Sequence, residues 1–410
     1  MTNRPTDADV IIVGAGVAGS SLAGLLALDG LDVVVLDRAQ FPRPKPCGEC
    51  INPGGVSALA RMGLLNAVRE HAPAQLASWS LLTDSGARAC GRYTVEGEYG
   101  LGMSRALLDE ILVKEAERRG ARVYEGVKAV NLVMSDRPRA KQRVIVKTTG
   151  LEGRRESWSA PMVVGADGLR SIVARRLGLV RRRPRIKKVS LTCRLRGTGP
   201  SRAGGVLFIT QRGTVGLAPV HAHEPLWNGT VVVYSKRWGR GIAPDPLAFF
   251  RAALAQAPFE WDGAPEIVGG PWISGPFDWP TRGAVADGAL LVGDASGYFD
   301  PLTGQGICSA FRSAEFAAPV ISQAVRKGRT GVSQLLEYEH ALRRMVRPTR
   351  VLQRVIEAAV SRPAAYRVVV ARLGVSRPFT DRLIEVVGDS LPLRSLAAPG
   401  VLRTLLWRAR

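Results

Sequence analysis

Three short segments that join glycines to an acidic residue each follow an apolar run. The first is Gly14-Ala-Gly16-Val-Ala-Gly19, which comes directly after residues 9–13, and Asp37 ends the next apolar run 18 residues later. Gly14 permits a tight turn, Gly16 lets an anion approach the backbone, and Gly19 lets a helix pack closely on a strand. Asp37 stands where a carboxylate accepts hydrogen bonds from a ribose. This spacing predicts a dinucleotide site.

The other two segments lie far along the chain. Gly165-Ala-Asp167-Gly168 follows the apolar residues 162–164, and Gly293-Asp294 follows residues 289–292. A further loop, Pro301-Leu-Thr-Gly304-Gln-Gly306-Ile307, opens a predicted helix with almost bare backbone. The free N–H groups and positive end of such a helix suit an anion. We therefore expect these segments to surround one charged ligand.

Two cysteines stand in a proline-rich loop, residues 41–50. Cys47 and Cys50 have the CxxC spacing of a redox pair or of half a metal site. No second pair of cysteines accompanies them, so we expect no metal site. The five cysteines are odd in number and scattered, which favours a reducing cytoplasm over a disulfide framework.

The elements that must position these residues follow from the apolar patterning. Helices are predicted near residues 20–28, 55–70, 104–119 and 307–326, and short strands with glycine and proline turns between 189 and 268. We expect an α/β fold with a Rossmann-like dinucleotide-binding domain, an inserted antiparallel β-sheet domain for the substrate and a helical C-terminal segment. The expected ranges are 1–75, 101–185 and 280–330 for the first, 76–100 and 186–279 for the second, and 331–410 for the third.

The charge balance is strongly basic. The 410 residues carry a formal net charge of +22, concentrated in residues 175–188 and after Met345. No nucleic-acid module is present, so we expect no nucleic-acid partner. An anionic membrane surface, an acidic carrier protein and a merely solvated arginine-rich face remain open. Residues 401–410 mix apolar and basic side chains with a tryptophan, which suits an interfacial helix or a helix docked on the core.

Neither a signal peptide nor a membrane-spanning stretch is expected, because the first nine residues are polar and no apolar run approaches 20 residues. We expect a cytoplasmic protein, with peripheral membrane contact through the basic C-terminal segment as the alternative.

Together, the three glycine-acid segments resemble the flavoprotein family that contains para-hydroxybenzoate hydroxylase, geranylgeranyl reductases and flavin-dependent halogenases. The order and spacing match up to about residue 330. The resemblance implies FAD as the cofactor, with NADH or NADPH as the electron donor. It implies that Asp37 binds the adenosine ribose, Arg105 and Asp167 lie near the pyrophosphate, and Asp294 binds the ribityl chain. The expected cofactor contacts are Gly14, Gly16, Ala18, Gly19, Asp37, Arg38, Gly48, Arg105, Asp167, Asp294, Gly304, Gly306 and Ile307.

Pro46-Cys47-Gly48-Glu49 is similar to a segment of the geranylgeranyl reductases that lies beside the flavin. Cys47 is accordingly the one candidate catalytic residue, which would tune the pocket or assist protonation. The reductases usually carry an aromatic-x-Trp-x-Phe-Pro signature, whereas Gly213-Thr-Val-Gly-Leu-Ala-Pro219 keeps only the proline. The halogenases carry a lysine after Gly-Glu and a Trp-x-Trp-x-Ile-Pro run, and this chain has neither.

These departures favour NAD(P)H-dependent monooxygenation of a hydrophobic aromatic, polyketide or quinone-like substrate. A dry apolar pocket beside the flavin would serve that reaction. The alternatives are a flavin reductase of an isoprenoid or quinone double bond and a membrane-associated flavin electron-transfer protein.

Overall fold

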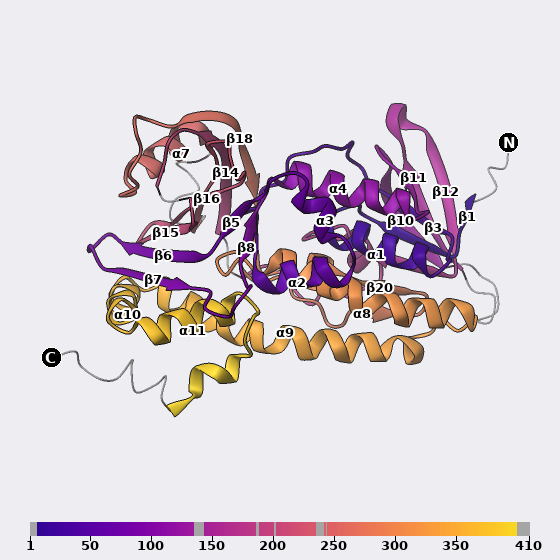
Figure 1. The fold of residues 1–410 in the computed structure, drawn as a ribbon. Coiled ribbons are helices and arrows are strands. Elements are labelled where there is room, and N and C mark those ends of the chain that lie inside the picture. The colour runs from indigo at the N-terminus through magenta and orange to yellow at the C-terminus, as the bar shows by residue number, and fades with distance from the viewer. Residues whose placement is uncertain are drawn as a thin grey trace.

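The computed structural model describes residues 6–134, 143–185, 188–200, 202–234, 242 and 244–399. Its parallel sheet and its large antiparallel sheet lie on opposite sides of the molecule, with helices beneath both (Figure 1). The α/β class with a Rossmann-like sheet and an antiparallel sheet is confirmed. The interfacial helix considered for residues 401–410 lies outside the described residues.

The nucleotide side is built on a six-stranded sheet in the order β19-β20-β13-β2-β3-β9, parallel except for β19. Its strands are β2 (Val10–Val13), β3 (Val33–Leu36), β9 (Arg122–Tyr124), β13 (Met162–Gly165), β19 (Val285–Ala286) and β20 (Ala289–Leu291). A four-stranded sheet lies beside it, formed by β1 (Thr6–Asp7), β10 (Lys128–Met134), β11 (Val144–Thr149) and β12 (Arg155–Ala160).

The second side is a seven-stranded sheet in the order β18-β14-β17-β16-β15-β6-β7, antiparallel except where β15 pairs with β6. Its strands are β6 (Ser78–Thr83), β7 (Arg88–Arg92), β14 (Lys188–Arg196), β15 (Gly204–Thr210), β16 (Gly213–Pro219), β17 (Leu226–Tyr234) and β18 (Glu266–Ser274). A small sheet of β4 (Cys50–Ile51), β5 (Ala74–Leu76) and β8 (Gly100–Gly102) crosses the expected boundaries at 75 and 100, which remain predictions.

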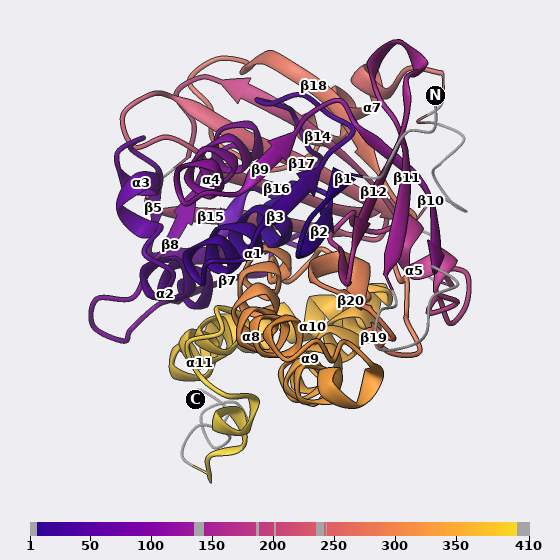
Figure 2. The ribbon, with the colours of Figure 1, turned by 90° about the vertical axis from the view of Figure 1, so that its right-hand side faces the viewer.

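Helices cover the sheets and close the lower side of the molecule (Figure 2). The α-helices of the described chain are α1 (Val17–Leu28), α2 (Pro53–Arg61), α3 (Leu65–Arg69), α4 (Arg105–Arg118), α5 (Ile172–Arg176), α7 (Pro246–Ala255), α8 (Gly306–Arg326), α9 (Val332–Val360), α10 (Pro363–Val375) and α11 (Arg377–Val387). The described residues also form three 3₁₀ turns, η2 (Leu151–Gly153), η3 (Gly293–Ser296) and η4 (Leu393–Ala397). None of the helices in the described ranges is both long and apolar enough to cross a membrane.

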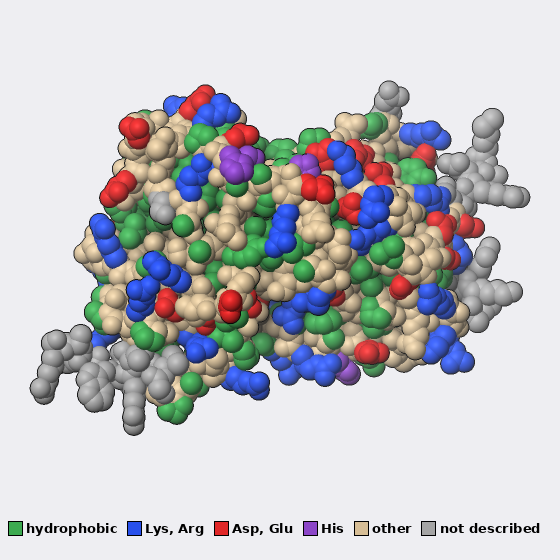
Figure 3. Space-filling view, in the orientation of Figure 1, with side chains coloured by type: hydrophobic (Ala, Val, Ile, Leu, Met, Phe, Trp, Pro, Cys, Tyr) green, Lys and Arg blue, Asp and Glu red, His purple; other side chains and the backbone are tan. Residues whose placement is uncertain are grey.

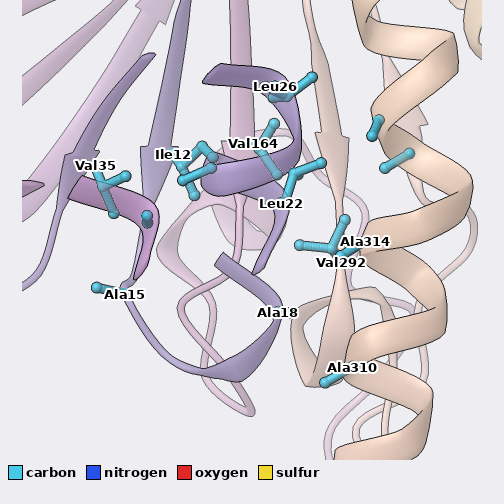
Figure 4. Close-up of a cluster of buried hydrophobic side chains, with 14 of the residues drawn as sticks. Ile12, Ala15, Ala18, Leu22, Leu26, Val35, Val164, Val292, Ala310 and Ala314 are labelled. Carbon is cyan, nitrogen blue, oxygen red and sulfur yellow. The ribbon is translucent and has the colours of Figure 1, made fainter. Parts of the chain in front are cut away.

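The main core forms where α1 and α8 pack on the parallel sheet (Figure 4). Ile12 and Val164 are fully buried on neighbouring strands and meet Leu22 of α1. Ala310 and Ala314 allow α8 to approach Ala18 and Val292 closely. Because β2, β13 and β20 are parallel neighbours, their carboxyl ends carry the three glycine-acid segments to one edge of the sheet.

Candidate active site

A cavity of about 1450 Å³ runs from that edge of the parallel sheet to the antiparallel sheet and the C-terminal helices. All three glycine-acid segments and the 301–307 loop line it, so the structure brings together parts that are up to 290 residues apart in sequence. Of the candidate site residues, those on the cavity wall are Gly14, Gly16, Ala18, Asp37, Arg38, Cys47, Gly48, Arg105, Asp167, Asp294, Gly304, Gly306 and Ile307.

Gly19 is the candidate that does not line the cavity. A Cβ on Gly19 would lie 1.8 Å from the carbonyl oxygen of Gly14, which is closer than any real contact. Gly14 itself has φ +105°, and its Cβ would lie 2.5 Å from the oxygen of Ala166. Gly19 therefore lets α1 pack closely on the turn at Gly14, and its contact with a ligand stays a prediction.

Asp37 is fixed at the end of β3 by two backbone donors. Ala15 N–H donates to Asp37 Oδ2 at 2.7 Å, and Ala39 N–H donates to Oδ1 at 2.8 Å. The buried carboxylate thus ties the glycine turn to the loop after β3 while it borders the cavity. Its position matches the acid that closes a dinucleotide fingerprint.

Three cations surround the point where α1 begins. A Cβ on Gly16 would lie 3.7 Å from Arg43 Nη2 and 4.0 Å from both Arg105 Nη2 and Lys45 Nζ. Gly16 is the N-cap of α1, so the free N–H groups of the first turn face the same space. Cationic side chains and a helix N-terminus that converge on bare backbone form a site for a phosphate or pyrophosphate group.

One buried carboxylate organises these cations. Arg105 donates to both oxygens of Asp109, at 2.9 Å and 2.8 Å, and Arg43 Nη1 lies 3.3 Å from Asp109 Oδ2. Burial opposes the charge on Arg105, but Asp109 outweighs it and raises the pKa of Arg105. Burial, followed by repulsion from Arg105, lowers the pKa of Lys45. The site therefore holds more positive charge than one aspartate neutralises.

The acids of the second and third segments lie on the same wall. Asp167 Oδ2 accepts from the Ile172 N–H at 2.6 Å, whereas its buried Oδ1 has no hydrogen-bond partner among the described residues. Burial raises the pKa of this carboxyl group. Asp294, in η3, is half-buried on the cavity wall. A buried acceptor without a donor indicates a group that the protein alone does not supply.

The proline-rich loop of residues 41–50, which we call the Cys47 loop, is held by the antiparallel sheet. Glu49 Oε1 accepts from the Arg105 N–H at 2.8 Å, and Oε2 accepts from Asn228 Nδ2 at 2.9 Å and from Arg194. Asn228 also donates to the carbonyl oxygen of Cys47 at 3.0 Å. Glu49, buried with φ +56°, thus joins α4, β14 and β17 at the cavity.

Cys47 itself is a free, half-buried thiol on the cavity wall. Its sulfur accepts from the Glu49 N–H at 3.3 Å. Cys50 donates to the carbonyl oxygen of Gly48 at 3.1 Å, and it is free as well. The CxxC spacing therefore forms no disulfide in this structure.

The sequence analysis did not identify several residues that line the cavity. Arg43, Lys45 and Glu49 lie in the proline-rich loop, and the sequence shows their charges but not which way their side chains point. Tyr298 also lines the cavity, and burial, with the nearby Asp294 and Asp300, raises its pKa well above 10, so that the phenol stays protonated. The two basic residues between Pro42 and Pro46 were the signal from which the sequence could have predicted that this loop also contributes to the anion site.

The far part of the cavity is apolar. The antiparallel sheet contributes Leu81, Leu207, Ile209, Leu217 and Val232, and the C-terminal helices contribute Leu352, Ile356, Val360, Val370, Leu373 and Leu383. Walls of this kind exclude water and fit a long hydrocarbon.

The chain matches the FAD binding domain family FAD_binding_3 over residues 7–355. It is 30% identical over 331 residues to the menaquinone reductase of Mycobacterium tuberculosis H37Rv, covering 77% of this chain and 76% of that one. It is 29% identical over 345 residues to the digeranylgeranylglycerophospholipid reductase of Methanothrix thermoacetophila, covering 82% and 83%.

Among solved structures, the myxobacterial chondrochloren halogenase CndH shares the fold with a TM-score of 0.75 at 20% identity, covering 98% of this chain and 97% of that one. A flavoprotein/dehydrogenase from Cytophaga hutchinsonii has a TM-score of 0.73 at 16% identity, covering 97% and 99%. These likenesses concern the fold alone.

The cavity wall fits FAD on three observations: the cations around Gly16, the bare helix start at Gly304 and Gly306, and the unpartnered oxygen of Asp167. The dinucleotide fingerprint, the convergence of three glycine-acid segments and the match over residues 7–355 agree. This chain belongs to the FAD-binding family and is an FAD-dependent oxidoreductase of the para-hydroxybenzoate hydroxylase and geranylgeranyl reductase superfamily.

Proposed function

We propose that this protein reduces a carbon–carbon double bond in the isoprenoid chain of a lipid or quinone, with NADH or NADPH as the source of electrons. The observation that carries the proposal is the apolar part of the cavity, which leads from the Cys47 loop to the C-terminal helices. A long, flexible hydrocarbon matches that lining, whereas a compact aromatic ring would leave most of it unfilled.

The relatives support the same substrate class. The names of the mycobacterial and archaeal relatives refer to menaquinone and to a digeranylgeranyl phospholipid, and both molecules carry isoprenoid chains. Both proteins are named as reductases. For these reasons we place double-bond reduction ahead of monooxygenation. Monooxygenation, which the sequence favours, stays an untested prediction.

Different residues of the site would bind the cofactor and supply the proton. Arg43, Lys45 and Arg105, with the N-terminus of α1, would hold the pyrophosphate, and Asp37 would hold the ribose. FAD, when bound and reduced by NADH or NADPH, would supply the hydride for one carbon of the double bond. The other carbon needs a proton, and the Cys47 thiol is the group on the wall that we assign to deliver it.

The surroundings of Cys47 suit that role. The Glu49 N–H that points at its sulfur stabilises the thiolate left after proton transfer, and Asn228 fixes the loop through the Cys47 carbonyl. Solvent then returns the proton. One hydride and one proton add across the double bond, so the product is two hydrogens heavier.

The test is an anaerobic incubation of the FAD-loaded protein with NADH or NADPH and a menaquinone or geranylgeranyl lipid. Mass spectrometry should show a product two hydrogens heavier. Incorporation of oxygen from labelled O₂ would instead support monooxygenation of the substrate, and turnover of neither kind would overturn the proposal.

The Cys47→Ala variant should retain bound FAD and lose about 10²–10⁴-fold in the rate of reduction, the usual contribution of a positioned proton donor. Cys90→Ala is the matched control, because Cys90 is exposed and does not line the cavity. Equal rates for the two variants would remove Cys47 from the mechanism.

A further inference from the structure

Five valines on the second half of α9 and on α10 are exposed. Their exposed fractions are 50% for Val351, 62% for Val355, 61% for Val368, 42% for Val369 and 60% for Val375. We call these five residues the valine face. Val351 and Val355 lie on one side of α9 because they are four residues apart, and Val368 and Val375 lie on one side of α10 because they are seven apart. Val369 lies about 100° around α10 from Val368. Aliphatic side chains exposed together on neighbouring helices mark an interaction surface.

The cavity reaches the surface at this face. Val355, Val368 and Val369 line the cavity although they are exposed, and they come from α9 and α10, which are in contact. Ile356 and Val370, which follow Val355 and Val369 in sequence, continue the lining inward. A long hydrocarbon could therefore pass between the two helices along a mostly apolar wall, on which Arg372 is the charged residue from α10.

The charge around the valine face is almost entirely positive. Residues 346–375 contain six arginines and one acid, Glu357. Glu357 does not neutralise the surface, because it bonds to Lys188 and accepts from Tyr234 at 2.6 Å. Arg367 pairs with Asp84. The four remaining arginines with exposed side chains are Arg347, Arg354, Arg362 and Arg372. In Figure 3 the Lys and Arg side chains gather along the lower edge, where α9 runs.

We propose that the valine face docks on the surface of an anionic lipid bilayer, with the valines among the acyl chains and the flanking arginines at the headgroups. Apolar side chains beside arginines, on helices that do not span a membrane, are the arrangement of interfacial binding. An acidic protein could pair with the arginines, but it would not explain why the cavity opens between exposed valines. The route for substrate between α9 and α10 rests on the proposed function, whereas the docking itself does not.

The test measures co-sedimentation of the FAD-loaded protein with vesicles of phosphatidylglycerol or of phosphatidylcholine, without substrate. We expect binding to phosphatidylglycerol at least tenfold stronger than to phosphatidylcholine, and weaker as salt rises. The Val351→Asp/Val375→Asp variant should bind at least tenfold more weakly. Both residues lie off the cavity wall, so reduction of a short, soluble isoprenoid substrate should be unchanged.

Leu28→Asp/Val133→Asp is the matched control, since Leu28 and Val133 are 63% and 40% exposed on α1 and β10. This control should bind like the wild type. Arg347→Glu/Arg354→Glu should abolish the preference for phosphatidylglycerol. Equal binding to both lipids, no binding at all, or an equal loss in the control would overturn the docking. A protein that binds vesicles but reduces no isoprenoid would overturn only the proposed function.

Discussion

At the scale of single residues, the site is defined by what gathers around Gly16. Arg43 and Lys45 approach it from one loop and Arg105 from α4, and Asp109 balances only part of their charge. Because they are positioned before any ligand arrives, little of the binding energy goes into ordering them.

A substitution of Gly16 should weaken FAD binding with little effect on the stability of the fold. In Gly16→Ala the added Cβ meets nothing closer than 3.7 Å, so we expect the free energy of unfolding to fall by no more than about 1 kcal/mol. The methyl group would occupy the space of the pyrophosphate, and the dissociation constant for FAD should rise at least tenfold. Gly150→Ala is the control, since Gly150 is also an N-cap with its nearest neighbour at 3.7 Å. Equal FAD affinity in both variants, measured by flavin fluorescence, would contradict the assignment.

The lowered pKa of Lys45 predicts an alkaline loss of FAD affinity. Lys45 is charged only below its pKa, so its attraction for the pyrophosphate disappears as pH rises through that pKa, which lies below the usual 10.5. An arginine stays charged over this range. We therefore expect Lys45→Arg to shift the loss of affinity to higher pH, as titrations between pH 7 and 10.5 would show. Lys327→Arg, at the exposed end of α8, should leave the profile as it is in the wild type.

At the scale of elements, α9 is tied to the antiparallel sheet by a buried cation. Lys188 of β14 bonds to Asp300 at 2.9 Å and to Glu357 of α9, and all three side chains are nearly inaccessible. Asp300 begins the loop that leads to Gly304, so one lysine fixes the cavity wall on two sides.

Lys188→Met should leave two buried carboxylates without a cation and lower the free energy of unfolding by about 3–5 kcal/mol. Lys114→Met removes an ion pair whose lysine is 70% exposed, and it should cost less than about 1 kcal/mol. Adding Glu357→Gln to Lys188→Met should recover part of the loss. Denaturant unfolding measures the stability of all three variants. Similar losses of unfolding free energy for Lys188→Met and Lys114→Met would show that the buried ion pairs of Lys188 contribute little.

At the scale of the whole molecule, the cavity joins the two sheets and the C-terminal helices into one reaction chamber. Its length predicts a dependence on substrate size. Each buried CH₂ contributes about 0.8 kcal/mol, so each added isoprene unit should raise kcat/KM about tenfold or more until the chain reaches α10. Gly216→Phe, on the cavity wall, should shorten the optimum while FAD stays bound. An unchanged rate for all chain lengths would place the substrate elsewhere.

The sequence by itself determined the nucleotide half of the protein. The glycines at 14, 16 and 19 are read correctly because a tight turn and a close helix–strand contact depend on local backbone and on the lack of a side chain. The helix predicted near residues 104–119 is α4, and Ser104 is its N-cap, with its hydroxyl accepting from the Leu107 N–H at 3.3 Å. Apolar periodicity placed α1, α4 and α8 because their burial follows from 3.6 residues per turn. The helix predicted over residues 55–70 is instead divided into α2 and α3, with Gly63 at φ +68° between them.

Only the tertiary structure decided which residues complete the site. Arg43 and Lys45 belong to it because the loop after β3 folds back over the start of α1, and Glu49 because Asn228, 179 residues away, holds it. The opening of the cavity between α9 and α10 depends on packing against β7, which no local pattern encodes. Contacts between distant segments follow from how whole elements fill space, so residue type and spacing alone could not reveal them.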